Sequence, residues 1–409
     1  MYLATCPEET KQALIDELHE MGACDIEPIY RGVRFSGSQE LFYLCHLKLR
    51  TASRLLKVIK EFPARSPEML YSQARRIPWS DLFDVRHGYL IEGVPGDRGQ
   101  EFMSGNDISK KVREGLQDSF TRKLGKIPTV DLKEPKVVIV AFVAGGRCTL
   151  SFDTSGKALH KRGYRSLSSH PAPIKETLAA AMLRMVGYDG SQVLLDPMCG
   201  SGTIVIEAAM ISLDKSPLIH RKKGEFLLEW LKDFDRGLWR TLLERCRSEK
   251  LDTLRAPIYA GDISAKYTTM ARDHALKARV EKYLEFHTKA FDKWKAPAPS
   301  GILVANLPYG ERLTPQVSRG EGRAARGLQS NKKMPLSPEE EAREKEFYKS
   351  LGDHLKQNFV GWRAALLAAD KSPAKFIGLK PTRKIPILNG TIPCKIWVFD
   401  LYEGSRKKA

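Results

Sequence analysis

The stretch Gln192-Val-Leu-Leu-Asp196-Pro-Met-Cys-Gly200-Ser-Gly202-Thr-Ile-Val-Ile-Glu-Ala-Ala decides the fold of this chain. Its apolar run 193–195 is typical of a strand buried on both faces, and the run ends in an acid, Asp196. A turn with two glycines follows, and a helical pattern begins at Thr203. Glycine lets the backbone approach a ligand closely, and a helix start offers free N–H groups. The stretch therefore predicts a strand–loop–helix unit with a ligand at its loop.

Two common phosphate-binding patterns do not fit this loop. Its glycines match neither the dinucleotide pattern Gly-x-Gly-x-x-Gly nor the P-loop, and no lysine follows them. An acid at the strand end suits a ligand that carries an ammonium group. For Gly-x-Gly alone, a tight turn without a ligand would be the better interpretation, but the full string Asp-Pro-Met-Cys-Gly-Ser-Gly-Thr is more specific.

This string resembles motif I of the class I S-adenosylmethionine-dependent methyltransferases, in the form used by the branch that methylates amines. The resemblance implies an α/β fold, with a C-terminal Rossmann-like domain built on a seven-stranded doubly wound sheet. It also implies that S-adenosylmethionine is the cofactor. The expected cofactor contacts in this motif are Asp196, Pro197, Met198, Cys199, Gly200, Ser201, Gly202 and Thr203.

A second stretch, Ile302-Leu-Val-Ala-Asn306-Leu-Pro308-Tyr309, is typical of a buried strand that ends in a polar residue. It resembles motif IV, (Asp/Asn)-Pro-Pro-Tyr, of enzymes that methylate exocyclic amines. The resemblance implies that the Asn306 side chain and the Leu307 carbonyl accept the two N–H groups of the amine, and that Tyr309 stacks on the base. Leu307 replaces a proline of the pattern, but Pro308 still favours an extended backbone at residue 307.

The resemblance implies further cofactor contacts on both sides of these motifs. Asp262 ends an apolar run and suits the two ribose hydroxyls, with Ile263 beside it. Asp292 matches the family position that accepts the adenine amino group, although lone strand-end aspartates are often helix caps. The strings that precede motif I in the family add Tyr164, Pro173 and Thr177, and Asn306 is expected to contact the cofactor as well.

Composition limits the other possibilities. A length of 409 residues predicts two or three domains, and a formal net charge of +18 favours a polyanionic partner, nucleic acid first. The seven cysteines form no Cys-x-x-Cys pair, which argues against a disulfide framework and against a zinc site. Since no stretch reaches the apolar length of a membrane span, we expect a cytoplasmic protein without membrane contact or metal, and a monomer.

The N-terminal part is expected to bind RNA. Residues 1–50 show a β-α-β-β-α pattern that resembles a ferredoxin-like subdomain. Residues 51–156 resemble the THUMP RNA-binding module, through the strings Leu49-Arg-Thr-Ala-Ser-Arg54, Ile77-Pro-Trp79, Ser109-Lys-Lys-Val-Arg113 and Leu150-Ser-Phe-Asp-Thr-Ser-Gly156. Basic residues in and just after these regions are candidate phosphate contacts, although any single one can be a solvated surface charge: Arg50, Arg54, Arg75, Arg76, Lys110, Lys111, Arg113, Lys161 and Arg162.

Residues 157–409 are expected to form the methyltransferase domain, with a flexible insertion at about 314–346. The whole chain resembles the bacterial THUMP-domain 23S rRNA guanine-N2 methyltransferases, in a form without the second methyltransferase that is fused to some of them. The resemblance implies N2-methylguanosine formation in 23S rRNA. Three alternatives remain open: a tRNA guanine, a non-catalytic RNA-binding or ribosome assembly factor, and DNA adenine methylation, which would leave the THUMP-like region unexplained.

Overall fold

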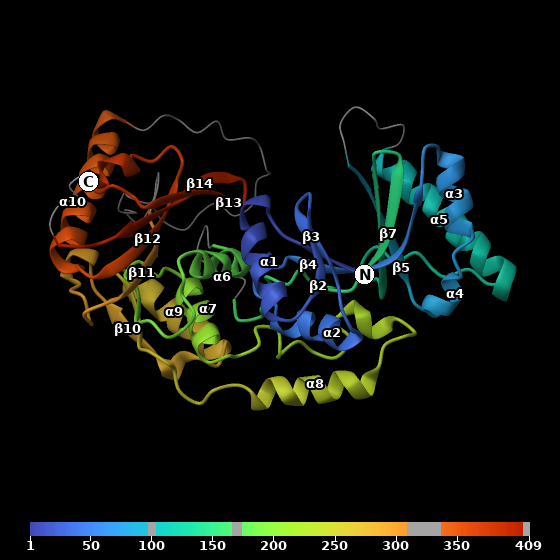
Figure 1. Ribbon diagram of the computed structural model, residues 1–409, viewed down its shortest axis with the longest axis horizontal. Helices are drawn as coiled ribbons and strands as arrows, with labels where there is room; N and C mark the ends of the chain where they lie inside the picture. The colour runs from blue at the N-terminus through green and yellow to red at the C-terminus, as the bar shows by residue number, and fades with distance from the viewer. Residues whose placement is uncertain (97–103, 166–173, 309–336, 404–409) are drawn as a thin grey trace, which may run out of the picture. The chain divides into compact units, whose positions relative to one another are not determined.

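The computed structural model describes residues 1–96, 104–165, 174–308 and 337–403 (Figure 1). Its contacts divide the chain into two compact units. The N-terminal unit consists of Met1–Gly163 and Asp214–Lys250, and the C-terminal unit consists of Tyr164–Leu213 and Leu251–Ala409. The expected domain division placed 214–250 with the methyltransferase residues, whereas in the structure this segment packs with the N-terminal residues.

A single seven-stranded sheet runs through the N-terminal unit, in the order β2-β3-β1-β4-β7-β6-β5. Neighbouring strands are antiparallel except β5 and β6, which are parallel. Strand β4 joins the ferredoxin-like strands to the other THUMP-like strands, because it pairs with β1 on one side and with β7 on the other. The strands are β1 (Tyr2–Thr5), β2 (Cys24–Ile29), β3 (Gly32–Ser36), β4 (Arg54–Pro63), β5 (Tyr89–Pro95), β6 (Val137–Ala144) and β7 (Arg147–Asp153).

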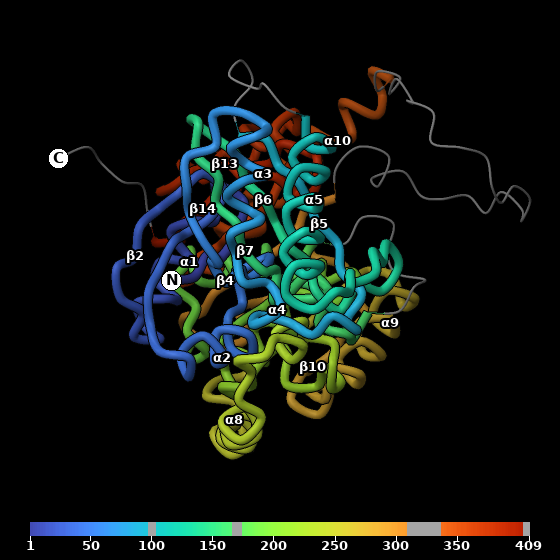
Figure 2. The backbone as a smooth tube through the Cα atoms, turned by 90° about the vertical axis from the view of Figure 1, so that its right-hand side faces the viewer, coloured from blue at the N-terminus to red at the C-terminus, as the bar shows by residue number. Residues whose placement is uncertain are grey.

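Helices of the N-terminal unit begin and end at residues that suit these positions. The longest begins after Ser104, which forms a capping box with Asp107, and ends at Gly125 with a left-handed φ of 63°. It packs beside α3, as Figure 2 shows. The helices are α1 (Lys11–Glu20), α2 (Gln39–Lys48), α3 (Pro67–Arg75), α4 (Trp79–Leu82), α5 (Gly105–Leu124) and α8 (Arg236–Ser248), with short 3-10 turns η1 (Glu8–Thr10) and η2 (Leu227–Trp230).

The C-terminal unit contains a second seven-stranded sheet, in the order β10-β9-β8-β11-β12-β14-β13. Strands β8 to β12 are parallel to their neighbours within that group, and β14 is antiparallel to both β12 and β13. The strands are β8 (Leu194–Asp196), β9 (Ile258–Asp262), β10 (Leu284–Thr288), β11 (Gly301–Asn306), β12 (Trp362–Ala369), β13 (Arg383–Asn389) and β14 (Ile392–Asp400).

Helices cover both faces of this sheet, because its central strands carry apolar side chains on each. In β11, Ile302 and Val304 belong to one core, while Leu303 and Ala305 belong to the other. Helices α6, α7 and α9 contribute to the first core and α10 to the second. The helices are α6 (Glu176–Met185), α7 (Thr203–Ser212), α9 (Ala265–Lys277) and α10 (Pro338–Asn358), with 3-10 turns η3 (Glu281–Tyr283), η4 (Phe291–Lys293) and η6 (Ala374–Ile377). The expected doubly wound α/β fold is confirmed.

The insertion expected at about 314–346 was predicted to end in a helix start at Ser337. Helix α10 begins there, and its Ser337 cap makes a capping box with Glu340. The insertion residues up to 336 lie outside the described residues. Among the helices that the structure describes, none combines the length and the apolar character that crossing a bilayer requires.

Candidate cofactor and acceptor site

The glycine-rich loop lies between β8 and α7, at the carboxyl ends of the parallel strands. Chain order runs from β8 to β9 on one side, while β11 pairs on the other side, so this is the switch point where open α/β sheets bind ligands. The loop is tied to β9: Cys199 N–H donates to the Gly261 carbonyl at 2.7 Å. Gly202 has φ 79°, and a Cβ there would lie 2.9 Å from the Ala271 Cβ of α9. Only glycine fits this close approach.

Two buried carboxylates border the loop. Asp196 is 1% exposed and accepts a hydrogen bond from Met198 N–H at 3.1 Å. Asp262 is 9% exposed and accepts bonds from Gly200 N–H at 3.0 Å and Ser264 N–H at 2.9 Å. Burial raises the pKa of Asp262, and burial together with the charge of Asp262 raises the pKa of Asp196 well above its usual value. A cationic ligand would offset this repulsion.

Asn306 ends β11 with an unused acceptor. Its side-chain Oδ1 is buried and has no hydrogen-bond partner among the described residues. A buried amide oxygen without a partner is costly, so this atom suits a ligand donor. The next residue, Leu307, is fully buried, and its N–H donates to the Leu367 carbonyl at 2.9 Å, which fixes the backbone that follows Asn306. Tyr309, expected to stack on the base, lies outside the described residues.

The remaining expected cofactor residues occupy different environments. Ile263 is 76% exposed next to Asp262. The side chain of Asp292 is 55% exposed and pairs with Lys293 at 3.3 Å. Tyr164 and Thr177 are buried, and the Tyr164 hydroxyl donates to Glu207 at 3.2 Å, so both line the interior beside α7. Pro173 lies outside the described residues.

Arg165 is a structural residue of the site that the motif analysis missed. Its Nη2 donates to Thr203 Oγ1 at 2.7 Å and also to the Ile174 carbonyl, while its Nε lies 3.2 Å from a Glu176 oxygen. The guanidinium thus holds the first residue of α7 against the chain before α6. His274 supports the same loop, since its Nδ1 lies 3.0 Å from the Ser201 carbonyl. The only signal in the sequence was that Arg165 ends the string Lys161-Arg-Gly-Tyr-Arg.

The candidate phosphate contacts separate into buried and exposed groups. Arg50 and Arg162 are 9% and 7% exposed, and their guanidinium groups donate to protein carbonyls, so the expected surface role is wrong for both. Arg54 pairs with the buried Asp153 and also donates to a backbone carbonyl. The others are exposed or half-buried: Arg75, Arg76, Lys110, Lys111, Arg113 and Lys161.

Family models match three consecutive regions of the chain. They are an RlmL ferredoxin-like domain at residues 1–56, a THUMP domain at 64–153 and an RMKL-like methyltransferase domain at 162–321. A relative from Synechocystis sp., named "Putative RNA methyltransferase", is 30% identical over 401 residues, which cover 98% of this chain and 97% of the relative. The chain belongs to the THUMP-containing RNA methyltransferases. The expected cofactor, S-adenosylmethionine, follows from the matched methyltransferase domain.

Further likenesses of this THUMP methyltransferase extend over its full length. A Syntrophotalea carbinolica relative, named Ribosomal RNA large subunit methyltransferase K/L, is 32% identical over 98% of this chain and 54% of the relative. The chain spans about half the length of such K/L relatives. A crystal structure called "a putative methyltransferase complexed with SAH" aligns with a TM-score of 0.81 and 23% identity, over 100% of this chain and 98% of that one, which shows a shared fold.

The residues of the site fit S-adenosylmethionine. The buried carboxylate pair favours a ligand with positive charge, and the Oδ1 of Asn306, which no described residue reaches with a hydrogen bond, favours a donor beside it. No group of three or more possible metal-ligating side chains occurs within the part of the chain that the structure describes.

Proposed function

We propose that this THUMP methyltransferase transfers a methyl group from S-adenosylmethionine to the N2 amine of a guanine in 23S rRNA. One observation carries the proposal: the buried Oδ1 of Asn306, at the carboxyl end of β11, has no hydrogen-bond partner within the described part of the chain. That position in a parallel sheet is where chemistry is placed, and an amide oxygen there is an acceptor for an amino group.

Methyl transfer to this amine depends on how the amine is oriented more than on a general base. An exocyclic amine on a guanine is a weak nucleophile, because its lone pair is delocalised into the ring. Two acceptors, Asn306 Oδ1 and the Leu307 carbonyl, would hold its two N–H groups and direct the lone pair toward the methyl group. When bound, the cofactor supplies that methyl group on a sulfonium, which leaves as a neutral thioether. The amine nitrogen then loses one proton to solvent.

The choice of substrate is supported by the N-terminal modules and by the K/L relatives. A THUMP module and a +18 charge suit RNA, and the names of the K/L relatives specify large-subunit ribosomal RNA. Asp262 on the ribose and Asp196 near the ammonium group are the proposed cofactor contacts, with residues 197–203 forming the loop around the methionine part. An rRNA substrate also supports the expected cytosolic location.

The test is to measure N2-methylguanosine on unmodified 23S rRNA fragments and on a tRNA pool. Asn306→Ala should lower kcat by about a hundredfold or more, because it removes an interaction that matters in the transition state. Its affinity for S-adenosylhomocysteine, measured by calorimetry, should stay near that of the wild type. Asn306→Asp keeps an oxygen at the same place and serves as the matched control, with activity well above that of the alanine variant.

Two results would contradict the proposal. Methyl groups found on tRNA alone, or on adenine N6, would reject the proposed substrate while leaving the enzyme a methyltransferase. Full activity of Asn306→Ala would reject the proposed acceptor role of this side chain.

A further inference from the structure

Residues 214–250 form an excursion that belongs in sequence to the methyltransferase region but folds into the N-terminal unit. The residues that flank this segment on its two sides are hydrogen-bonded to each other in the C-terminal unit, where Leu251 N–H donates to the Leu213 carbonyl at 2.8 Å. Its apolar side chains, among them Phe226, Leu228, Trp239 and Leu242, are buried in the core of the ferredoxin-like part. Helix α8 of this segment packs along α2 (Figure 1).

The segment also reaches the seam between the ferredoxin-like and THUMP parts. This seam is the pairing of β4 with β7 and the chain that follows β7, residues 154–158. Residues 154–158 continue beside β4, since Thr154 N–H donates to the Leu55 carbonyl at 3.0 Å. His46 Nε2 lies 2.9 Å from the Thr154 hydroxyl, and Arg54 pairs with Asp153, the last residue of β7.

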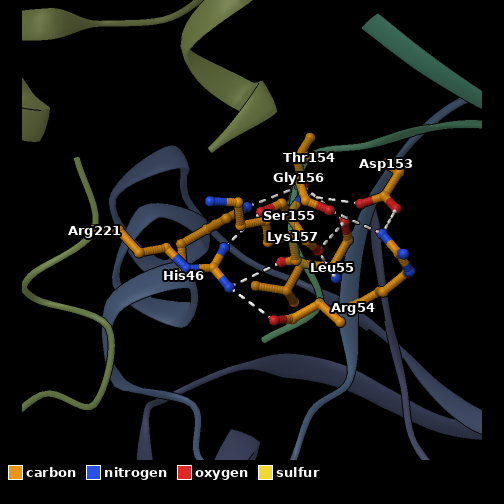
Figure 3. Close-up of polar contacts among 10 residues, drawn as sticks. His46, Arg54, Leu55, Asp153, Thr154, Ser155, Gly156, Lys157 and Arg221 are labelled. Carbon is orange, nitrogen blue, oxygen red and sulfur yellow. Dashed lines mark hydrogen bonds and ion pairs between the residues drawn. The ribbon is translucent and has the colours of Figure 1, made fainter. Parts of the chain in front are cut away.

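Arg221 lies beside residues 154–158, as Figure 3 shows. Its Nη1 donates to the Ser155 carbonyl at 2.7 Å, and its Nη2 donates to the carbonyls of Lys157 and Ala158, at 2.8 Å each. The planar guanidinium serves these three carbonyls from two nitrogen atoms held in a fixed geometry, whereas an ammonium group presents its three donors from a single nitrogen. The cation also lies 4.8 Å from the centre of the Phe226 ring.

Backbone contacts around Arg221 leave the seam little freedom. Leu228 N–H donates to the Thr154 carbonyl at 3.2 Å. Gly156 has φ 69°, and a Cβ there would lie 2.1 Å from the Glu225 carbonyl oxygen. Burial, with the nearby charge of Arg162, lowers the pKa of Arg221 to about 10, so the guanidinium keeps all its donors at neutral pH.

We propose that Arg221 is a positioning residue for RNA capture. It locks the β4–β7 seam, so that the ferredoxin-like and THUMP parts present one fixed surface before RNA arrives. A preorganised surface binds more tightly, because less conformational freedom is lost on binding. Arg221 itself does not touch RNA, and the methyltransferase region, through residues 214–250, thereby completes the RNA-binding unit. The inference rests on the proposed action on RNA.

The test uses full-length Arg221→Met, which keeps the apolar stem and removes the three hydrogen bonds. Lys222→Met is the matched control, because it removes the same charge from an exposed neighbour. Affinity for the RNA that the wild type methylates is measured over a range of salt concentrations, together with kcat, KM and affinity for S-adenosylhomocysteine. We expect Arg221→Met to weaken RNA binding about tenfold and to raise KM for RNA equally, with kcat, cofactor affinity and salt slope unchanged. Lys222→Met should bind almost as the wild type does.

Two outcomes overturn the inference. Wild-type RNA affinity in Arg221→Met would make the seam contacts purely structural, and a salt slope reduced by about one charge would make Arg221 a direct phosphate contact. If Arg221→Met does not fold, Arg221→Lys carries the same test, since it keeps the charge and loses the planar geometry. Methylation by the wild type in the same assay tests the proposed function separately.

Discussion

His46 lies fully buried in the N-terminal unit, with Nδ1 2.8 Å from the Phe42 carbonyl oxygen and Nε2 2.9 Å from the Thr154 hydroxyl. Burial lowers its pKa to about 3, from an ordinary value of 6.5. The folded state therefore keeps His46 neutral at pH values below 6.5, where the same histidine binds a proton in the unfolded state. The contribution of neutral His46 to the unfolding free energy is therefore complete above pH 6.5 and declines as the pH falls toward 3.

We expect the N-terminal unit to lose about 2 kcal/mol of unfolding free energy between neutral pH and about pH 5 through this residue. Urea unfolding of the wild type and of His46→Gln, at both pH values, measures the effect. The glutamine variant should show a smaller pH dependence, whatever its absolute stability. An equal pH dependence in the two proteins would exclude His46 as the titrating group.

At the scale of elements, the glycine loop and α7 depend on a close approach to α9. Gly202→Ala places a methyl group 2.9 Å from the Ala271 Cβ, at a φ that disfavours side chains. We expect a loss of about 1–3 kcal/mol in stability and weaker binding of S-adenosylhomocysteine, because the loop must move away from α9.

The matched control for this substitution is Gly390→Ala, which has a similar φ of 67° but no atom within 4 Å of the added Cβ. It carries the backbone cost without the collision, so thermal unfolding of both variants separates the two effects. If both lose the same stability, the contact with α9 does not constrain the loop. Calorimetry should show normal cofactor affinity in the control.

For the whole molecule, the net charge of +18 predicts RNA binding that weakens steeply with salt. Arg75 and Arg76 are exposed at the end of α3 and are the basic residues with which we test it. Replacing both by Met should lower RNA affinity and reduce the slope of log affinity against log salt by up to about 2.

The control double variant replaces Lys123 and Arg86, which already pair with Asp81 and Asp84, by Met. It removes the same formal charge from cations that are locally neutralised, so its salt slope should stay closer to that of the wild type. A slope unchanged in the Arg75 and Arg76 variant would show that these two side chains do not contact phosphate. This result differs from the one expected for Arg221, which changes affinity without changing the slope.

The packing of residues 214–250 against the ferredoxin-like part limits what a truncated protein can test. A fragment that begins near Ala158 would retain residues 214–250 but lose the ferredoxin-like core that covers Phe226, Trp239 and Leu242. Single substitutions in the full chain therefore test RNA binding more cleanly than this truncation.

The local order of residues determined the doubly wound sheet, the THUMP-like region and the family, because motifs I and IV are contiguous strings. A strand end, a glycine turn and a helix start depend on neighbours in the chain, so Asp196 and Asn306 could be placed at strand ends, and Gly202 at a helix start, in advance. The lack of a donor to Asn306 Oδ1 among the residues that the structure describes is a property of the folded state, since it depends on which donors reach the end of β11.

Only the tertiary structure decided which charged side chains far from the motifs are buried and which are exposed. Arg50 donates to the carbonyl of Lys215, which is 165 residues away in the chain, and Arg221 serves carbonyls more than 60 residues before it. No local pattern distinguishes such an arginine from an exposed one. Burial of a guanidinium is settled by the carbonyls that distant segments bring to it, and for this chain those segments meet only when 214–250 folds into the N-terminal unit.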